Sequence, residues 1–225
     1  MKITKQNTPK RIQTIAQQIA HPTIADIGTD HGYVPIYACL FGHATTAIAC
    51  DIRTGPLATA KKNISANGLA QKIETRLGYG FCSIYPKEVQ TAVIAGMGGD
   101  TIIKILSHGA AVVAELSQLV LGAQSNVCGL RRFLHTIDYK ISNELFVYTT
   151  NNFYIIINAT KGSEQPYNAT QYMLGKILLQ KREQPFLNYL QKQITKYEAI
   201  KQKVSGRRLS EIEYMLDIYK EALHK

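Results

Sequence analysis

The sequence predicts an α/β protein whose sheet has a parallel core and an antiparallel C-terminal hairpin, followed by a small α-helical coiled-coil domain. Two observations predict this architecture. Up to about residue 138, short apolar runs alternate with helical stretches, which is typical of βαβ units. Beyond residue 166 no strand-like run occurs, and apolar residues recur at steps of three and four, as in paired helices.

Five short apolar runs predict the strands of the parallel core. They occupy residues 23–27, 46–52, 72–77, 91–95 and 118–122. The helices between and after them are predicted at residues 33–41, 56–67, 100–107 and 130–135. Strands that alternate with helices in this order indicate a parallel, Rossmann-like sheet. In such a sheet, each helix connects two parallel strands by a right-handed crossover. Two further strands, at residues 139–148 and 153–158, are joined by residues 149–152 and predict the antiparallel hairpin at one edge.

The C-terminal part is expected to follow a polar linker at residues 161–166. Its helices are predicted near residues 171–182, and at 186–204 and 209–223. Ser205-Gly206 separates the two long helices, so they are expected to form an antiparallel hairpin of coiled-coil type. The predicted domains are therefore residues 1–162 and 167–225.

The composition excludes several classes of protein. The chain has 225 residues of which 45% are apolar, too many for a disordered protein. The polar, basic N-terminus does not resemble a secretory signal, and the longest uncharged stretch, residues 31–50, is broken by glycine and proline, so no membrane span is expected. The four cysteines form no C-x-x-C pair, which leaves a zinc site unsupported and suits a reducing cytoplasm.

The charge indicates a polyanionic partner, with nucleic acid the first expectation. Lys and Arg total 26 against 16 Asp and Glu, a net charge of +10. Basic side chains gather near the tip of the predicted helical hairpin. The candidates there for contact with nucleic acid are Lys192, Lys196, Arg207 and Arg208. A solvated helix face explains the same residues equally well, so both interpretations stay open.

A glycine turn closes the first strand and opens the first helix. Gly28 permits a sharp turn, and Gly32 permits close approach of the backbone. A dinucleotide fingerprint needs glycine where this chain has Asp30, and a carboxylate there would repel a pyrophosphate. S-adenosylmethionine (SAM) carries a cationic amino group and a sulfonium, so an acidic turn suits it better. A strand–glycine–helix turn without a ligand is the alternative.

Two further strand ends support a nucleoside site beside this turn. Asp51 follows Gly28 by 23 residues, close to the spacing of about 20 at which an acid reaches a ribose hydroxyl. The fourth strand runs into Ala-Gly-Met-Gly-Gly at residues 95–99, where the glycines permit close approach to the backbone. The first and fourth strands are expected to be neighbours, with the ligand crevice beyond their carboxyl ends.

The segments IADIGTDHGYVP (residues 24–35) and AGMGG, with the C-terminal helical hairpin, resemble the bacterial tRNA (adenine-N1)-methyltransferases that modify adenosine 22. Further similar segments are residues 9–12, 55–56 and 124–126. The resemblance implies a class I methyltransferase fold, SAM as the cofactor, methylation of adenine N1 in tRNA, and no metal. Two positions depart from the family: Ser125 stands where proline is usual, and Tyr79 where Asp or Asn is frequent.

The resemblance and the acidic turn assign roles to individual residues. The expected catalytic residues are Asp30, His31 and Asn126. Asp30 either accepts a hydrogen bond from the exocyclic amine of the target adenine and offsets its developing charge, or only binds the ammonium of the cofactor. Tyr33 is a candidate stacking surface for the target base. The expected cofactor-binding residues are Arg11, Asp26, Gly28, Thr29, Asp51, Ile52, Tyr79, Gly80, Ala95, Gly96 and Met97.

The expected partner is tRNA, with no membrane and no metal, and the protein is expected to act as a monomer in the cytoplasm. Three alternatives remain at this stage. One is a non-catalytic RNA-binding protein with a degenerate SAM pocket, for which Tyr79 is the only support. Another is an RNA methyltransferase of different specificity. The third is a nicotinamide oxidoreductase, against which Asp30 and the AGMGG segment argue.

Overall fold

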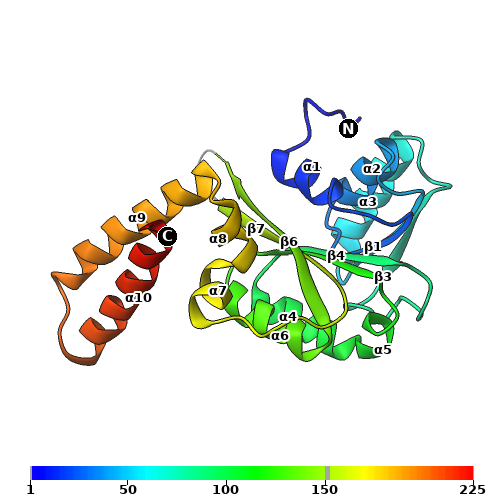
Figure 1. Ribbon diagram of the computed structural model, residues 1–225. Helices are drawn as coiled ribbons and strands as arrows, with labels where there is room; N and C mark the ends of the chain where they lie inside the picture. The colour runs from blue at the N-terminus through cyan, green and yellow to red at the C-terminus, as the bar shows by residue number, and fades with distance from the viewer. Residues whose placement is uncertain (1, 150–152, 225) are drawn as a thin grey trace. The chain divides into compact units, whose positions relative to one another are not determined.

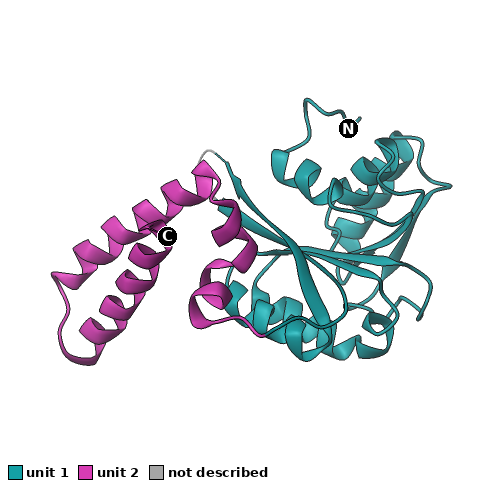
Figure 2. Cartoon of the chain, viewed as in Figure 1, with its two compact units in different colours: residues 1–165 teal, residues 166–225 magenta. Residues whose placement is uncertain are grey.

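The computed structural model describes residues 2–149 and 153–224. Contacts divide the chain into two units, Met1–Gln165 and Pro166–Lys225, coloured separately in Figure 2. This boundary falls between the predicted domain ends at residues 162 and 167. Most of the connection predicted between the two hairpin strands, residues 150–152, lies outside the described residues.

The first unit is built on one sheet of seven strands in the order β3-β2-β1-β4-β5-β7-β6 (Figure 1). Their bounds are β1 (Thr23–Ile27), β2 (Thr46–Asp51), β3 (Ile73–Leu77), β4 (Thr91–Met97), β5 (Gln118–Ala123), β6 (Tyr139–Tyr148) and β7 (Phe153–Lys161). β1 to β5 are parallel, whereas β7 is antiparallel to both β5 and β6. The α/β prediction, including the antiparallel hairpin, is confirmed.

The strand order reverses beside β1, which pairs with β2 on one side and β4 on the other. Ile27, the last residue of β1, lies opposite Cys50 of β2 and Ile94 of β4. All three side chains are buried, because this part of the sheet is covered on both faces. A crevice at the carboxyl ends of these strands is the consequence of this topology.

Helices cover the two faces of the sheet. They are α1 (Lys10–Ala16), α2 (Tyr33–Leu40), α3 (Thr54–Ala66), α4 (Gly99–His108), α5 (Ala110–Val113) and α6 (Val127–Thr136). Figure 1 shows α1, α2 and α3 on one side and α4, α5 and α6 on the other. The short helices α1 and α5 are not anticipated from the sequence. Four of the seven residues of α1 are buried, so packing rather than intrinsic propensity stabilises this short helix.

Two strands extend by more than one residue beyond the sequence-based expectation. β4 continues to Met97, so Gly96 and Met97 belong to the strand and not to a loop after it. β7 continues to Lys161, into the segment predicted as linker, because its residues pair with β6 as far as Tyr139. In both cases the strand continues past its apolar run because its last residues pair with a neighbouring strand, β5 for β4 and β6 for β7.

The second unit contains α7 (Ala169–Leu174), α8 (Lys176–Lys181), α9 (Gln184–Lys201) and α10 (Gly206–His224). The single helix expected near residues 171–182 is wrong, because Gly175, with φ of 96°, divides it into α7 and α8. α9 and α10 pack together as predicted, and their buried residues include Leu190, Ile194 and Leu216. Within the described residues no helix is both long and apolar enough to cross a membrane.

Candidate active site

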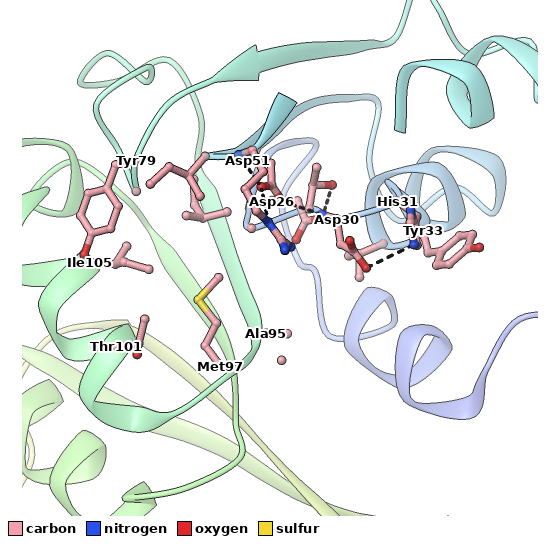
Figure 3. Close-up of a pocket in the computed structure, with 18 of the residues that line it drawn as sticks. Asp26, Asp30, His31, Tyr33, Asp51, Tyr79, Ala95, Met97, Thr101 and Ile105 are labelled. Atoms are coloured by element: carbon pink, nitrogen blue, oxygen red, sulfur yellow. Dashed lines mark hydrogen bonds and ion pairs between the residues drawn. The ribbon is translucent and has the colours of Figure 1, made fainter. Parts of the chain in front are cut away.

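A cavity of about 460 Å³ opens at the carboxyl ends of β1, β2 and β4. In Figure 3, Asp26, Asp30 and Asp51 lie toward one end, and Tyr79, Thr101 and Ile105 toward the other. The structure brings together every residue that the sequence predicted for the cofactor, together with Asp30, His31 and Tyr33. The predicted cofactor residues in the lining are Arg11, Asp26, Gly28, Thr29, Asp51, Ile52, Tyr79, Gly80, Ala95, Gly96 and Met97.

The turn after β1 depends on glycine at position 28. Gly28 has φ of +77°, and a Cβ there would collide with the side chain of Met97. The amides of Gly28 and Thr29 both donate to the carbonyl of Cys50, at 2.9 and 2.8 Å. These bonds fasten the turn to the end of β2, so that Asp26, Asp30 and Asp51 all line one cavity.

Asp51 holds the backbone of the two segments that follow β1 and β2. Its carboxylate is buried and accepts hydrogen bonds from the amide of Asp30 at 3.0 Å and from that of Arg53 at 2.9 Å. The first bond holds Asp30 at φ of +53°, a conformation in which Asp is tolerated better than most residues. Each Asp51 oxygen keeps a lone pair for a ligand hydroxyl.

Asp26, like Asp51, is a buried acid of the cavity. Its side chain accepts a hydrogen bond from the hydroxyl of Thr29 at 2.7 Å. The pKa of Asp26 is raised to about 7, chiefly by burial and also by the nearby charge of Asp51, although the Thr29 hydrogen bond and the charge of Arg11 act to lower it. A cationic ligand group would favour the ionised carboxylate.

Asp30 and His31 stand at the open side of the cavity. Their side chains are 57% and 43% exposed, and Oδ2 of Asp30 lies 3.6 Å from Nε2 of His31 (Figure 3). Nδ1 of His31 is buried and has no hydrogen-bond partner among the described residues. The ring of Tyr33 meets the imidazole edge-on, with centroids 5.7 Å apart. The carboxylate of Asp30 and the exposed part of the His31 ring are therefore accessible to a second ligand that enters from outside.

The other end of the cavity is less polar. Tyr79 is 39% exposed, and its ring meets that of His108 edge-on at 6.1 Å between centroids. Ile105 and Thr101 of α4 line this end, and sequence reasoning missed both. Their spacing of four residues, directly after AGMGG, places them on one helix face and could have indicated them.

Asn126 is placed differently from the other predicted site residues. It is not in the lining of the cavity; its side chain accepts a hydrogen bond from the amide of Gly129 and donates to Asp100, at 3.0 and 2.6 Å. It thus caps the start of α6. The lining instead includes Gln124, which belongs to the similar segment 124–126 but was not predicted as a site residue.

The basic residues predicted for RNA contact lie in the second unit. Lys192, Lys196, Arg207 and Arg208 are all exposed. Arg207 and Arg208 both pair with Glu211, at 3.3 and 3.4 Å. Part of the positive charge at this tip is therefore already offset. Among the described residues no group of His, Cys, Asp and Glu is arranged to hold a metal ion.

Known proteins resemble this chain in sequence and fold over nearly its whole length. The family model for tRNA (adenine(22)-N(1))-methyltransferase matches residues 24–222. The Bacillus subtilis protein of that name is 28% identical over 228 residues, covering 95% of this chain and 96% of its own. A structure of Streptococcus pneumoniae Sp1610 in complex with SAM has a TM-score of 0.89 at 28% identity, covering 96% of this chain and 99% of that one.

A structure of M. capricolum TrmK in complex with S-adenosylhomocysteine has a TM-score of 0.86 at 27% identity. It covers 96% of this chain and 97% of its own. The match to the family model extends through both units, so it is not restricted to the sheet that many cofactor-binding proteins share. The chain therefore belongs to the tRNA (adenine(22)-N(1))-methyltransferase family.

Proposed function

We propose that this protein transfers the methyl group of SAM to N1 of adenosine 22 in tRNA, with Asp26, Asp30 and Asp51 receiving the cofactor and the target base. The observation that carries the proposal is the gathering of these carboxylates around one cavity, in a chain of this family. Carboxylates would repel the pyrophosphate of a nicotinamide dinucleotide. The same arrangement complements the ammonium and sulfonium of SAM.

The cavity fits the parts of SAM along its length. Asp51 accepts hydrogen bonds from the ribose hydroxyls, using the lone pairs that its backbone bonds leave free. Arg11 meets the cofactor carboxylate, while the acids of the turn attract its ammonium. Tyr79 and Ile105 enclose the adenine. The glycines at 28 and 96 keep the middle open, since side chains there would press on Met97 and Arg11.

The methyl transfer requires little from the protein beyond correct placement of the target base and the methyl donor. Adenine N1 has an in-plane lone pair and needs no base, and SAM supplies a methyl group activated by its sulfonium. Asp30 accepts a hydrogen bond from the exocyclic amine of the target base and offsets the positive charge that develops on the ring. His31 orients the base and Tyr33 stacks on it. Since N1 is hidden in a base pair, the target nucleotide must be unpaired or flipped.

The helical unit is the proposed tRNA-binding domain, through Lys192, Lys196, Arg207 and Arg208. We also propose that the protein acts as a monomer in the cytoplasm. All four cysteines are free thiols, as a reducing compartment favours. Light scattering with and without tRNA tests the oligomeric state.

The direct test is methylation of tRNA in vitro. Protein, SAM and unmodified tRNA should give 1-methyladenosine, detected by mass spectrometry of nucleosides and mapped by the arrest of reverse transcription at position 22. A tRNA with guanosine at that position is the matched control and should remain unmethylated. The absence of product from a complete set of tRNAs would refute the proposal.

Asp30→Asn separates the two roles considered for Asp30. Asparagine keeps the size and tolerates the positive φ, but it removes the charge. If the carboxylate stabilises the developing charge, kcat should fall by roughly 10- to 1000-fold while the affinity for S-adenosylhomocysteine changes little. Asp138→Asn, at an exposed aspartate with φ of 56° outside the cavity, is the matched control. Weaker cofactor binding with unchanged kcat would make Asp30 a cofactor ligand only.

A further inference from the structure

The guanidinium of Arg11 lies between an aromatic ring and a glycine in the wall of the cavity. Its central carbon is 5.1 Å from the ring centroid of Tyr154. One of its nitrogens is 3.4 Å from the position that a Cβ of Gly96 would occupy. Within residues 2–149 and 153–224 no carboxylate is within ion-pair distance of this cation. Among the described residues, the Tyr154 ring is therefore the main support of this guanidinium.

Tyr154 belongs to β7, one of the two antiparallel strands of the sheet. Ile155 of β7 pairs with Ala123 at the end of β5, so Tyr154 lies at the edge where the parallel strands end. Because β7 runs against β5, its beginning lies next to the cavity and its end lies away from it. Tyr154 is half-buried against the main hydrophobic core, so its ring has a fixed support.

We propose that Tyr154 is a positioning residue for cofactor binding: its ring holds the Arg11 guanidinium against Gly96, in the place where it meets the carboxylate of SAM. The inference rests on the proposed function and assigns a role to a strand outside the predicted site. A cation held over a ring in a partly desolvated wall is attracted to the face of the ring. Holding the guanidinium there also removes rotamer freedom before the ligand arrives.

Two substitutions separate the ring from its hydroxyl. Tyr154→Phe keeps the π-face and should bind S-adenosylhomocysteine within about twofold of the wild type. Tyr154→Leu keeps an apolar side chain but removes the π-face, and should weaken that binding roughly 3- to 30-fold, measured by calorimetry. The KM for SAM should rise by a similar factor while kcat stays near the wild-type value. Thermal unfolding of both variants checks that the fold persists.

A truncated ligand distinguishes positioning from a merely structural role. 5′-Methylthioadenosine has the adenosine and sulfur of SAM but neither its carboxylate nor its amino group, so Arg11 has nothing to meet. Tyr154→Leu should leave its affinity unchanged. In an Arg11→Gln background, Tyr154→Leu should have no further effect on S-adenosylhomocysteine. An equal loss for both ligands, or an unchanged affinity for S-adenosylhomocysteine in Tyr154→Leu, would overturn the inference.

The outcome is separable from that of the proposed function. If wild-type protein binds S-adenosylhomocysteine and methylates tRNA, but Tyr154→Leu binds as the wild type does, the function stands and the role of Tyr154 falls. If the wild type binds neither ligand, the proposed function itself fails, and the role of Tyr154 fails with it.

Discussion

The buried carboxyl group of Asp26, which the proposed cofactor site uses, lowers the free energy of unfolding at neutral pH. The residue is 4% exposed, and its pKa is raised to about 7 from the ordinary value of 3.8, chiefly by burial. Below about pH 4 the group is protonated in both the folded and the unfolded chain. Between pH 4 and 7 only the unfolded chain loses the proton, so the free energy of unfolding falls as the pH rises and levels off above pH 7.

Asp26→Asn should remove this loss. The amide oxygen can still accept the Thr29 hydroxyl, but asparagine carries no charge at any pH. The variant should therefore be more stable than the wild type at pH 8 and similar near pH 4, as measured by urea unfolding. It should also bind SAM more weakly at pH 8, because a negative charge is absent. Asp138→Asn is the exposed control and should follow the wild-type pH dependence; an Asp26→Asn curve parallel to the wild type would contradict this account.

At the scale of elements, a buried ion pair joins α6 to β6. Nε of Arg131 lies 2.7 Å from Oε1 of Glu144, and both side chains are fully buried. α6 follows directly on the segment whose Gln124 lines the cavity, and β6 supports β7, the strand that carries Tyr154. The pair therefore braces two elements behind the site without touching it.

Glu144→Leu should destabilise the fold by about 3–5 kcal/mol, because it leaves the Arg131 charge buried without its carboxylate. Arg131→Met combined with Glu144→Leu should recover much of that loss, since the two apolar side chains leave no charge behind. Urea unfolding of the single and double variants measures both effects. A double variant that loses as much as the sum of the two single variants would show that the two residues act independently.

The elements also show what sequence patterns can and cannot predict. The β1–β5 core and the glycine turn follow from apolar runs, Gly28 and strand-end acids, all of which act locally. The break at Gly175 and the helix α1 depend on packing that a single chain segment does not encode. Asn126 is predicted as a catalytic residue from its motif, and that role stays a prediction, whereas only the structure shows that its side chain caps α6. Tyr154 was inaccessible to motif reasoning, since only the antiparallel pairing of β7 brings it to Arg11.

At the scale of the whole molecule, the net charge of +10 predicts binding that weakens as salt rises. Neutralising Lys192, Lys196, Arg207 and Arg208 to Gln should weaken tRNA binding and flatten the slope of log K against log salt. Each lost phosphate contact should reduce that slope by about 0.7–0.9. Binding of S-adenosylhomocysteine should be unchanged. Filter binding over a salt series measures the slope.

A matched variant distinguishes an effect of these four positions from an effect of the net charge of the protein. Four exposed lysines of the first unit, at positions 61, 62, 72 and 87, can be changed to Gln for the same loss of charge. This variant should lose less affinity than the one at the helical tip. Equal losses would mean that net charge alone is responsible, and that the tip is an ordinary solvated face.

Glu211→Gln should have the opposite effect on the same surface. Its carboxylate pairs with both Arg207 and Arg208, so removing the charge releases two guanidinium groups for phosphate. Because an exposed pair of this kind contributes little to stability, the fold should be unaffected. The variant should bind tRNA more tightly and with a steeper salt dependence. Unchanged binding in Glu211→Gln, beside a clear loss when the four basic residues are neutralised, would place the phosphate contacts on the two lysines alone.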